Sequence, residues 1–425
     1  MIDSRLVLDD FETTARELGR KGVERSALEE LKDALESRKR IVREVGERRA
    51  EMNKGSAEIG QLLSKGLKDE ADERRRGIAA LKEQIRSLDA ELRDVEADVE
   101  DRLLRIPNLP AVEAPDGKGE EDNVVLRVHG HDPERYESGT WEPHWDIASR
   151  LGLWDPERSA KLSGAMFSVL RGDGARLLRA LALFALDLHR DTYEEILPPH
   201  YVRTEIMVGT GHLPKFEEEA YRLRDDDLWA IPTGEVPLMG LHRDEILPEA
   251  DLPRRYMTYT VCWRREAGAA GKDTRGMQRL HEFHKVELLK LCLPEKSREE
   301  FDSLLADCER GLQVLGLPYR VVDLSTADLT FSSARVHDLE VFSPGLDKWL
   351  EVSSVGLFTD FQARRGNIRF RRGDGRTLGF VHSLNGSGLA TPRIWAAVLE
   401  HGLQPDGTVR LPEALVPYMG SDTIG

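Results

Sequence analysis

Residues 262–289 read CWRREAGAAGKDTRGMQRLHEFHKVELL, and this stretch decides the fold class. Two runs suited to β-strands, 262–267 and 278–289, flank a segment rich in glycine. Strands joined in this way form an antiparallel hairpin with a long loop. Because side chains alternate between the two faces of a strand, one face of the second strand is expected to carry Arg279, His281, Phe283, Lys285 and Glu287.

That face has the residue types that bind a nucleotide. Arginine pairs with phosphate, an aromatic ring stacks on a base, and a carboxylate accepts from an amine or a hydroxyl. The alternative is a solvent-exposed face of paired charges. A zinc site made from Cys262, His281 and His284 is less favoured, because the two histidines fall on opposite faces of a strand.

Further strands are expected towards the C-terminus. Runs rich in β-formers occur at 319–325, 335–342, 348–358, 367–372 and 377–385, and a helical pattern covers 175–189. Strands outnumber the intervening helices, and several neighbouring strands are joined by short links. This arrangement favours an α+β fold with an antiparallel sheet and flanking helices over a doubly wound parallel sheet.

The first hundred residues have a different pattern, with apolar residues at heptad a and d spacing. The first series is Leu28, Leu31, Leu35, Val42, Val45, Met52, Ile59 and Leu63, with Arg38, Arg49 and Ser56 at the remaining seam positions. The second series is Ile78, Leu81, Ile85, Leu88, Leu92, Val95 and Val99. A link over 64–73, with Gly66 as its turning point, predicts an antiparallel helical hairpin.

The first helix of this hairpin is locally basic. Residues 36–54 contain seven basic and four acidic side chains, in a chain whose net charge is −16. They are expected towards the outer half of the hairpin, either as a solvated coiled-coil surface or as a phosphate-binding surface. Arginine at seam positions costs packing stability, which favours binding.

Composition limits the remaining possibilities. The 425 residues are 40% hydrophobic, enough for a packed core, and the acidic charge excludes a protein coated for nonspecific nucleic-acid binding. Cys262, Cys292 and Cys308 are expected to be reduced thiols of a cytoplasmic protein. We expect neither a signal peptide nor a membrane span. Residues 1–105 are interpreted as the helical arm, 106–125 as a linker rich in proline and glycine, and 126–425 as a catalytic domain.

Three shorter motifs carry polar side chains. NGSGLATPRIWAAVLE (385–400) predicts a strand end, a Gly-Ser-Gly turn and a helix whose first turn holds Arg393, an arrangement that favours an anion. WLEVSSVG (349–356) places Glu351 and Ser354 as oxygen ligands for Mg²⁺, or is an ordinary strand. IPTGEVPL (231–238) is a rigid polar loop with Thr233 and Glu235.

Together these motifs resemble those of the bacterial-type seryl-tRNA synthetases, along nearly the whole chain. The heptad hairpin followed by RIPNLP is similar to the tRNA-binding arm of that family, and VGTGHLPKF (208–216) is similar to a typical stretch. RREAGAAGKDTRGMQRLHEFHKVEL matches class II motif 2, NGSGLATPR matches motif 3, and EILPPHYV (195–202) lies at the place of motif 1. The resemblance implies a class II antiparallel sheet, a homodimer through motif 1, ATP, Mg²⁺, L-serine and tRNA(Ser), with tRNA(Sec) as a further candidate acceptor and no DNA or membrane partner.

The resemblance also implies site residues. It assigns the α-phosphate and the serine carboxylate to Arg264, and the γ-phosphate to Arg393; both are the implied catalytic residues. The implied ATP-binding residues are Arg264, Arg265, Glu266, Arg279, Leu280, Phe283, Glu351, Val352, Ser353, Ser354 and Arg393. The implied serine-binding residues are Thr233, Gly234, Glu235, Arg264, Glu287, Asn385 and Ser387. The implied metal ligands are Glu351 and Ser354, and the implied tRNA contacts of the arm are Arg38, Lys39, Arg40 and Arg43. The loop 267–271 would close on the tRNA end.

Some residues depart from the usual family pattern. They are Gly234 in place of Ala, Trp263 in place of Phe, Arg265 in place of Ser, Glu282 in place of Gln, and Val355 with Gly356 in place of Cys with Ser or Asn. None removes a residue to which chemistry is assigned. The alternatives are a paralogue that activates serine for a carrier, a drug-tolerant duplicate, and a non-catalytic tRNA-binding protein.

Overall fold

The computed structural model describes residues 1–138, 141–267 and 275–425. It divides the chain into two compact units, Ile2–Pro107 and Asn108–Gly425, of which the second also includes Met1. Most of the loop expected to close on a tRNA end, 267–271, lies outside the described residues. In the part of the chain that is described, no helix is long and apolar enough to cross a membrane.

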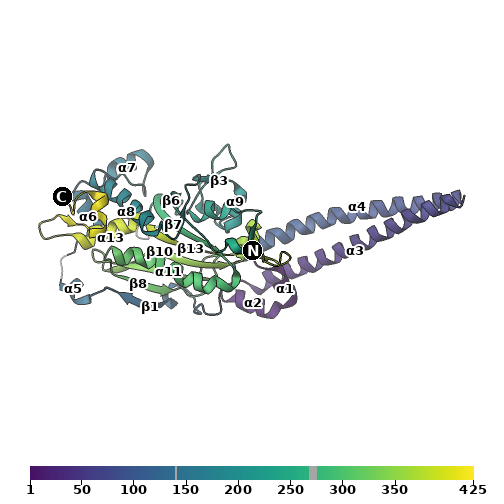
Figure 1. Cartoon of the computed structure of the whole chain (residues 1–425), viewed down its shortest axis with the longest axis horizontal. Helices are drawn as coiled ribbons and strands as arrows, with labels where there is room; N and C mark the ends of the chain where they lie inside the picture. Colours follow the sequence, from purple (N-terminus) through teal and green to yellow (C-terminus); the bar gives the residue numbers. More distant parts are fainter. Residues whose placement is uncertain (139–140, 268–274) are drawn as a thin grey trace. The chain divides into compact units, whose positions relative to one another are not determined.

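The first unit is a helical hairpin preceded by two short helices. Helices α1 (Ser4–Asp9) and α2 (Phe11–Gly19) lead into α3 (Arg25–Ser64), which packs against α4 (Lys68–Arg105), as Figure 1 shows. The turn occupies only residues 65–67, with Gly66 at φ 76°. The predicted link was therefore too long at its C-terminal end. Asp69 and Glu70 lie in the first turn of α4, where carboxylates stabilise the positive end of the helix dipole.

The predicted heptad seam is correct in α4 but shifts by one residue in α3. Ile41 is 1% exposed whereas Val42 is 50% exposed, so the seam steps by three residues twice, from Leu35 to position 38 and then to Ile41. An extra three-residue step overwinds a coiled coil locally. After the shift, Arg49 leaves the seam and donates to Asp89 of α4 across a 2.9 Å ion pair.

The second unit is built on an eight-stranded sheet of order β1-β8-β9-β10-β13-β7-β6-β2, in which every pair is antiparallel except β2 with β6. The strands are β1 (Val124–His129), β2 (Glu194–Glu195), β6 (Arg254–Trp263), β7 (Glu282–Cys292), β8 (Tyr319–Asp323), β9 (Arg335–Ser343), β10 (Lys348–Thr359) and β13 (His382–Ala390). The α+β prediction, with an antiparallel sheet and a helical arm, is confirmed.

Several boundaries differ from the sequence-based expectation. Strand β6 ends at Trp263 and β7 begins only at Glu282, so Arg279 and His281 precede the strand instead of lying in it. The run 377–385 divides into β12 (Leu378–Phe380) and β13. The expected Gly-Ser-Gly turn is wrong: β13 continues through Gly386, Ser387 and Gly388, because Gly386 and Ser387 are paired with β7 and pairing resumes at Leu389 after a bulge at Gly388.

One face of the sheet is apolar and carries the main core. Val286 and Leu288 of β7 point to this face, where helices α8 (Asp173–His189), α11 (Ser297–Val314) and α13 (Thr391–Gly402) cover it. Trp395 of α13 is fully buried there, and its indole donates to the carbonyl of Gly174 at 2.9 Å. The alternating residues Lys285 and Glu287 must therefore point to the opposite face.

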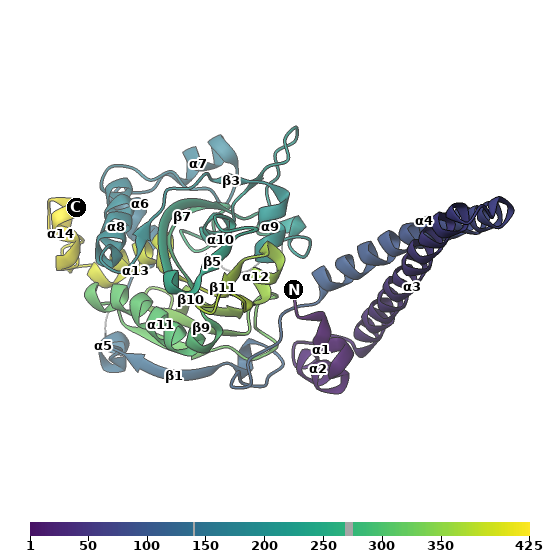
Figure 2. The same ribbon diagram turned by 45° about the vertical axis from the view of Figure 1, so that its right-hand side comes forward.

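Three short helices lie together in the same unit, as Figure 2 shows: α9 (Thr204–Thr210), α10 (Glu235–Gly240) and α12 (Phe361–Gly366). Helix α10 contacts β7, and α12 contacts β13 and β10. The small sheet beside them is β12-β11-β5, with β5 at Ile246–Pro248 and β11 at Arg369–Arg371. The remaining elements are α5 (Pro133–Ser138), α6 (His144–Arg150), α7 (Pro156–Ser163), α14 (Val416–Met419), β3 (Tyr201–Val202), β4 (Trp229–Ala230), β14 (Val409–Arg410) and β15 (Thr423–Ile424).

The segment rich in proline and glycine is hydrogen-bonded to the second unit. The backbone N–H of Asn108 donates to the carbonyl of Phe331 at 2.9 Å, and that of Ala111 donates to the carbonyl of Ala334 at 2.7 Å. These two backbone groups thus find partners outside any helix or strand of this segment.

Candidate active site

Strand register gathers the predicted polar residues on one face of the sheet. Glu287 of β7 is opposite Ser387 of β13, and Asn385 lies two residues before Ser387 on the same face. Asn385 in turn is opposite Gly356 of β10, two residues after Ser354. Three central strands therefore contribute to one polar surface, on the face away from the main core.

A bulge in β10 brings Glu351 to this surface as well. Residues three apart on a regular strand point to opposite faces, which would separate Glu351 from Ser354. The register shifts between Glu351 and Ser353, so Glu351 is opposite Glu340, and Ser354 is opposite Asp338. The extra residue restores both side chains to one face. The sequence prediction paired Glu351 with Ser354, and this bulge is the local feature that makes the pairing possible.

Buried charges line the end of the surface formed by β6, β7 and α10. The hydroxyl of Thr233 donates to a carboxylate oxygen of Glu287 at 2.9 Å and accepts from the backbone N–H of Glu235 at 3.4 Å. The ammonium of Lys285 forms an ion pair with the same oxygen of Glu287. All four side chains are buried, and Glu287 already has a cationic partner.

Glu235 is the second carboxylate of this pocket and has a different environment. Its side chain is buried, and no basic side chain lies within ion-pair distance of it in the described ranges. The side-chain amide of Gln362 in α12 donates to it at 2.5 Å. Burial raises the pKa of Glu235 to about 7, and the charge of Glu287 adds to the rise, while Gln362 opposes it.

Arg264 lies directly after β6. Its guanidinium lies 5.1 Å from the centre of the Phe283 ring and donates to the carbonyl of Pro232 at 3.3 Å. Its backbone N–H donates to the carbonyl of His281 at 2.9 Å, which continues the hairpin beyond the strands. Arg264, expected to bind phosphate, and Phe283, expected to stack on a base, thus contact one another in this structure.

The neighbouring residues of the hairpin form a second set of contacts. Glu266 has a φ of 49°, in the left-handed region, and its carboxylate pairs with Arg279 at 3.0 Å. Arg265 instead contacts the Tyr221 ring, with its guanidinium 5.6 Å from the ring centre. Arg265 thus points to a partner outside the predicted set, whereas Glu266 and Arg279 hold one another.

Arg393, in the first turn of α13, contacts Glu351. Its guanidinium donates to the Glu351 backbone carbonyl, lies 3.4 Å from the Glu351 carboxylate, and donates to the carbonyl of Gln278 at 3.2 Å. Desolvation would raise the pKa of Glu351, but the charges of Arg393 and Arg264 outweigh it and hold that pKa below its ordinary value. Glu351, the implied metal ligand, therefore lies close enough to Arg264 and Arg393 for both charges to stabilise its carboxylate.

Other predicted residues serve the site through the backbone or through packing. Leu280 and Val352 are buried apolar residues, and the hydroxyl of Ser353 donates to the Ser387 carbonyl at 2.9 Å. The zinc alternative finds no support: Cys262 is a buried free thiol, and the described residues contain no cluster of three or more His, Cys, Asp or Glu placed for a metal.

Sequence analysis did not single out three features: the side chain of Gln362, the pairing of Lys285 with Glu287, and Asp338, which lies opposite Ser354. The Lys285–Glu287 pair could have been found, because residues two apart on a strand share a face. Gln362 gave no such signal, since its partners lie far away in the sequence.

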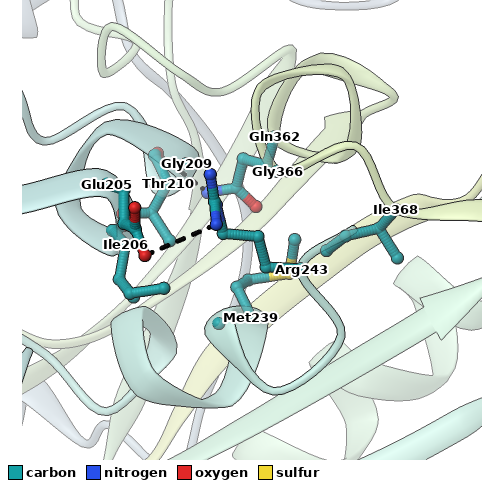
Figure 3. A pocket seen from close by; sticks show the side chains of 10 residues that line it. Glu205, Ile206, Gly209, Thr210, Met239, Arg243, Gln362, Gly366 and Ile368 are labelled. Carbon is teal, nitrogen blue, oxygen red and sulfur yellow. Dashed lines mark hydrogen bonds and ion pairs between the residues drawn. The ribbon is translucent and has the colours of Figure 1, made fainter. Parts of the chain in front are cut away.

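A small pocket lies beside this polar surface, between α9, α10 and α12 (Figure 3). Figure 3 shows the guanidinium of Arg243 pointing to Glu205, at 3.4 Å, with Thr210 and Gln362 at the back. None of the residues predicted from sequence lines it. The pocket therefore adjoins the predicted site through Gln362 and is distinct from it.

Comparison with protein families agrees with this fold. The class II tRNA synthetase core domain (G, H, P, S and T) matches residues 215–402, and the seryl-tRNA synthetase N-terminal domain matches residues 1–110. The antiparallel sheet and its motifs thus define a class II aminoacyl-tRNA synthetase.

Individual relatives narrow the class to one family. Serine–tRNA ligases from Synechococcus sp. (strain RCC307) and Dehalococcoides mccartyi (strain CBDB1) are 46% and 43% identical to the chain, and each alignment covers 100% of the chain and at least 99% of the relative. The crystal structure of seryl-tRNA synthetase from Pyrococcus horikoshii complexed with ATP has a TM-score of 0.93 and 35% identity, covering 100% of this chain and 99% of that one. The chain belongs to the seryl-tRNA synthetase family.

Proposed function

We propose that the protein activates L-serine with ATP, forming seryl-adenylate and pyrophosphate, and then transfers the seryl group to the terminal ribose of tRNA(Ser). One observation carries the proposal: a single sheet face joins a buried acidic pocket to a pair of arginines. The acidic pocket suits the ammonium group of an amino acid, and the arginines suit its carboxylate and the phosphates of ATP.

The first step needs charge neutralisation and alignment more than a protein nucleophile. A serine carboxylate oxygen attacks the α-phosphorus, and the bond from that phosphorus to pyrophosphate breaks. Arg264 binds the α-phosphate and the serine carboxylate, and Arg393 binds the γ-phosphate. Both guanidinium groups now contact protein groups, Phe283 and Glu351, which ATP would replace as partners.

The adenine end of ATP is assigned to the hairpin. The Phe283 ring is half-buried on β7 and offers a stacking surface once the Arg264 guanidinium turns to phosphate. Glu266 accepts from the adenine amine, and its ion pair with Arg279 holds the carboxylate in place. Leu280, Val352 and Ser353 contribute shape and backbone groups rather than charge.

The residues present fit a Mg²⁺ ion that arrives with the nucleotide. Mg²⁺ usually keeps several waters and takes one or two protein oxygens together with phosphate oxygens. Glu351 offers one carboxylate and Ser354 one hydroxyl on the same face, and these two residues would hold the ion. The ion would supply positive charge to the phosphates.

Serine is assigned to the pocket around Thr233, Glu235 and Glu287. Thr233 and Gly234 form its wall, and Asn385 and Ser387 of β13 line the side opposite β7. A site of buried hydrogen-bonding groups rejects an analogue that lacks the serine hydroxyl, because those groups would then be left unpaired. This argument supports serine over alanine.

The helical hairpin is proposed to bind tRNA through Arg38, Lys39, Arg40 and Arg43. Lys39, Arg40 and Arg43 are exposed, and Arg38 is partly exposed. They lie roughly 30–40 Å along α3 from the turn, at 1.5 Å per residue, and so not in the outer half that we expected for them. Phosphate contacts from such residues give affinity and salt dependence but no base specificity.

We also propose a homodimer formed through the motif 1 segment, 195–202, acting in the cytoplasm. Leu197 in this segment is 82% exposed, and Leu183 of α8 is 53% exposed, which supports an apolar contact surface. All three cysteines are free and buried, in keeping with a reducing compartment.

Serine-dependent exchange of pyrophosphate into ATP tests the activation step, and charging of tRNA(Ser) tests the transfer. We expect both with serine and Mg²⁺, and neither with alanine at the same concentration. Exchange without tRNA charging would instead support activation of serine for another acceptor. Absence of exchange would refute the proposed function.

A further inference from the structure

Gln362 lies beneath the proposed serine pocket, in the first turn of α12. Its side chain is 0% exposed, and every polar atom of its amide has a partner. The amide donates to Glu235 at 2.5 Å and to the backbone carbonyl of Thr210 at 3.1 Å. The hydroxyl of Ser383 in β13 lies 2.6 Å from the amide oxygen.

These partners fix the orientation of the amide. A carbonyl and a carboxylate only accept hydrogen bonds, so the NH₂ group must face Thr210 and Glu235 and uses both of its hydrogens there. The amide oxygen must then face Ser383, whose hydroxyl donates to it. Gln362 is therefore held from two sides, by β13 and by the end of α9, and it delivers one hydrogen to Glu235.

The charges around Glu235 explain why a neutral donor matters. Glu287 and Lys285 face it from β7, and Asn385 faces it from β13. The ammonium group of Lys285 forms its ion pair with Glu287 and not with Glu235. A lysine or arginine at position 362 would neutralise Glu235, whereas an amide orients the carboxylate and leaves its negative charge for a bound cation.

We propose that Gln362 is a positioning residue for amino-acid binding: it holds the Glu235 carboxylate, ionised, towards the ammonium group of serine. The inference rests on the proposed function, because it needs serine as the ligand of this pocket. The nearest cationic group to Glu235 in the working enzyme is then the substrate itself.

The pH dependence follows from the same contacts. Burial and the charge of Glu287 raise the pKa of Glu235, and the hydrogen bond from Gln362 lowers it. Loss of that hydrogen bond raises the pKa of Glu235 further, so more of the carboxyl is protonated near neutral pH and binds an ammonium poorly. Raising the pH should restore the carboxylate and part of the serine affinity.

The test uses the full-length Gln362→Met variant, which is close in size but has no hydrogen to donate. Serine KM, ATP KM and kcat are measured by pyrophosphate exchange at pH 6.5, 7.5 and 8.5. We expect serine KM to rise about 10- to 100-fold at pH 7.5, the range for losing a hydrogen bond to a charged group. ATP KM should stay within about twofold, and the defect should shrink at pH 8.5.

The control is Gln313→Met on the exposed side of α11, which removes a 2.7 Å hydrogen bond to the hydroxyl of Tyr319 in β8, outside the proposed site. Its serine KM should equal that of the parent. An unchanged serine KM in Gln362→Met overturns the inference. Equal losses for serine and ATP, or a defect that does not depend on pH, also overturn it, because they indicate a general structural role.

A second variant covers the case in which Gln362→Met does not fold. Ser383→Ala removes the hydroxyl that orients the amide, and serine KM should rise about threefold or more while ATP KM is kept. No change in this variant refutes the inference. The parent is assayed first: absence of serine-dependent exchange in the parent rejects the proposed function, whereas exchange in the parent with unaffected variants rejects only the role of Gln362.

Discussion

Replacing Gly234 by alanine should destabilise the protein and weaken serine binding. A Cβ added at Gly234 would lie 2.6 Å from the Thr258 Cγ2 and 2.9 Å from the Glu287 Cβ, far inside the 3.5–4.0 Å of a normal carbon contact. Thr258 can turn about its χ1 torsion, but the Glu287 Cβ is fixed to the backbone of β7. The loop that carries Thr233 and Glu235 must therefore move.

Two opposing effects set the magnitude. The backbone of Gly234 has φ −63° and ψ −22°, which alanine adopts readily, so the unfolded chain loses entropy and the change gains about 0.4–1 kcal/mol. Overpacking of a buried site costs about 1–3 kcal/mol. The overpacking outweighs the entropic gain, and we expect the free energy of unfolding to fall by about 0.5–2 kcal/mol.

The functional cost comes from the hydrogen bond between Thr233 and Glu287. As a hydrogen bond to a charged group it is worth about 1.5–3 kcal/mol, so its loss should raise serine KM roughly 10- to 100-fold in pyrophosphate exchange. Thr258→Ala should recover part of both losses in the Gly234→Ala background, because it removes the nearer obstacle.

Thr258→Ala alone is the matched control. The Thr258 hydroxyl has no hydrogen-bond partner within the described ranges, so its removal should cost little by itself. The two substitutions should therefore be coupled by at least about 0.5 kcal/mol in urea unfolding. If Gly234→Ala is as stable as the parent with an unchanged serine KM, or if Thr258→Ala restores nothing, the steric argument is wrong.

Four further predictions concern the site and the arm. Arg393→Ala should remove about 3–4 kcal/mol of transition-state stabilisation and so slow pyrophosphate exchange. An exchange rate within threefold of the parent would contradict the phosphate role of Arg393. Deleting residues 31–99 with a short Gly/Ser link should keep serine-dependent exchange but sharply raise tRNA KM. If the protein without residues 31–99 charged tRNA as well as the parent, the proposed tRNA-binding role of the hairpin would be refuted. Replacing Arg38, Arg40 and Arg43 with glutamine should reduce the slope of tRNA affinity against salt concentration, on logarithmic scales, by up to about 3. Glu235→Gln should abolish serine binding yet stabilise the protein in urea at pH 8. The folded-state pKa of Glu235 is raised from 4.5 to about 7, so its cost to stability grows as the pH rises between these values and is complete above about 7. The difference should therefore fade towards pH 5, and a difference independent of pH would contradict this prediction.

The sequence predicted the parts of the fold that depend on repeated local patterns. Strand alternation around Lys285 and Glu287 was sufficient for the antiparallel hairpin and its polar face. The heptads identified both long helices, but adjacent Ile41 and Val42 satisfy two different seams, and only packing against α4 selects Ile41. Family, fold class and enzyme class are confirmed; the role of each site residue stays a prediction.

Features that depend on distant partners could not be found in this way. The side chain of Gln362 contacts Thr210, Glu235 and Ser383, none of which is near it in the sequence. The bulge at β10 adds one residue without any distinctive composition, so Glu351 and Ser354 were paired by the chemistry of their oxygen atoms and by resemblance, and not by strand geometry. Gly386 likewise reads as a turn residue until its pairing with Leu288 of β7 is known.

The irregularities of β10 and β13 limit how this protein can evolve. Strand β10 has an extra residue between Glu351 and Ser353, β13 has one between Ser387 and Leu389, and the Ser353 hydroxyl joins the two places through the Ser387 carbonyl. Point substitutions leave the alternation of side chains intact. Deletion of Val352 from the chain would instead turn either Glu351 or Ser354 to the apolar face. No later substitution could reverse that change; only a second insertion nearby could. In proteins descended from this chain, amino-acid substitutions in these two strands should therefore be much more frequent than insertions or deletions.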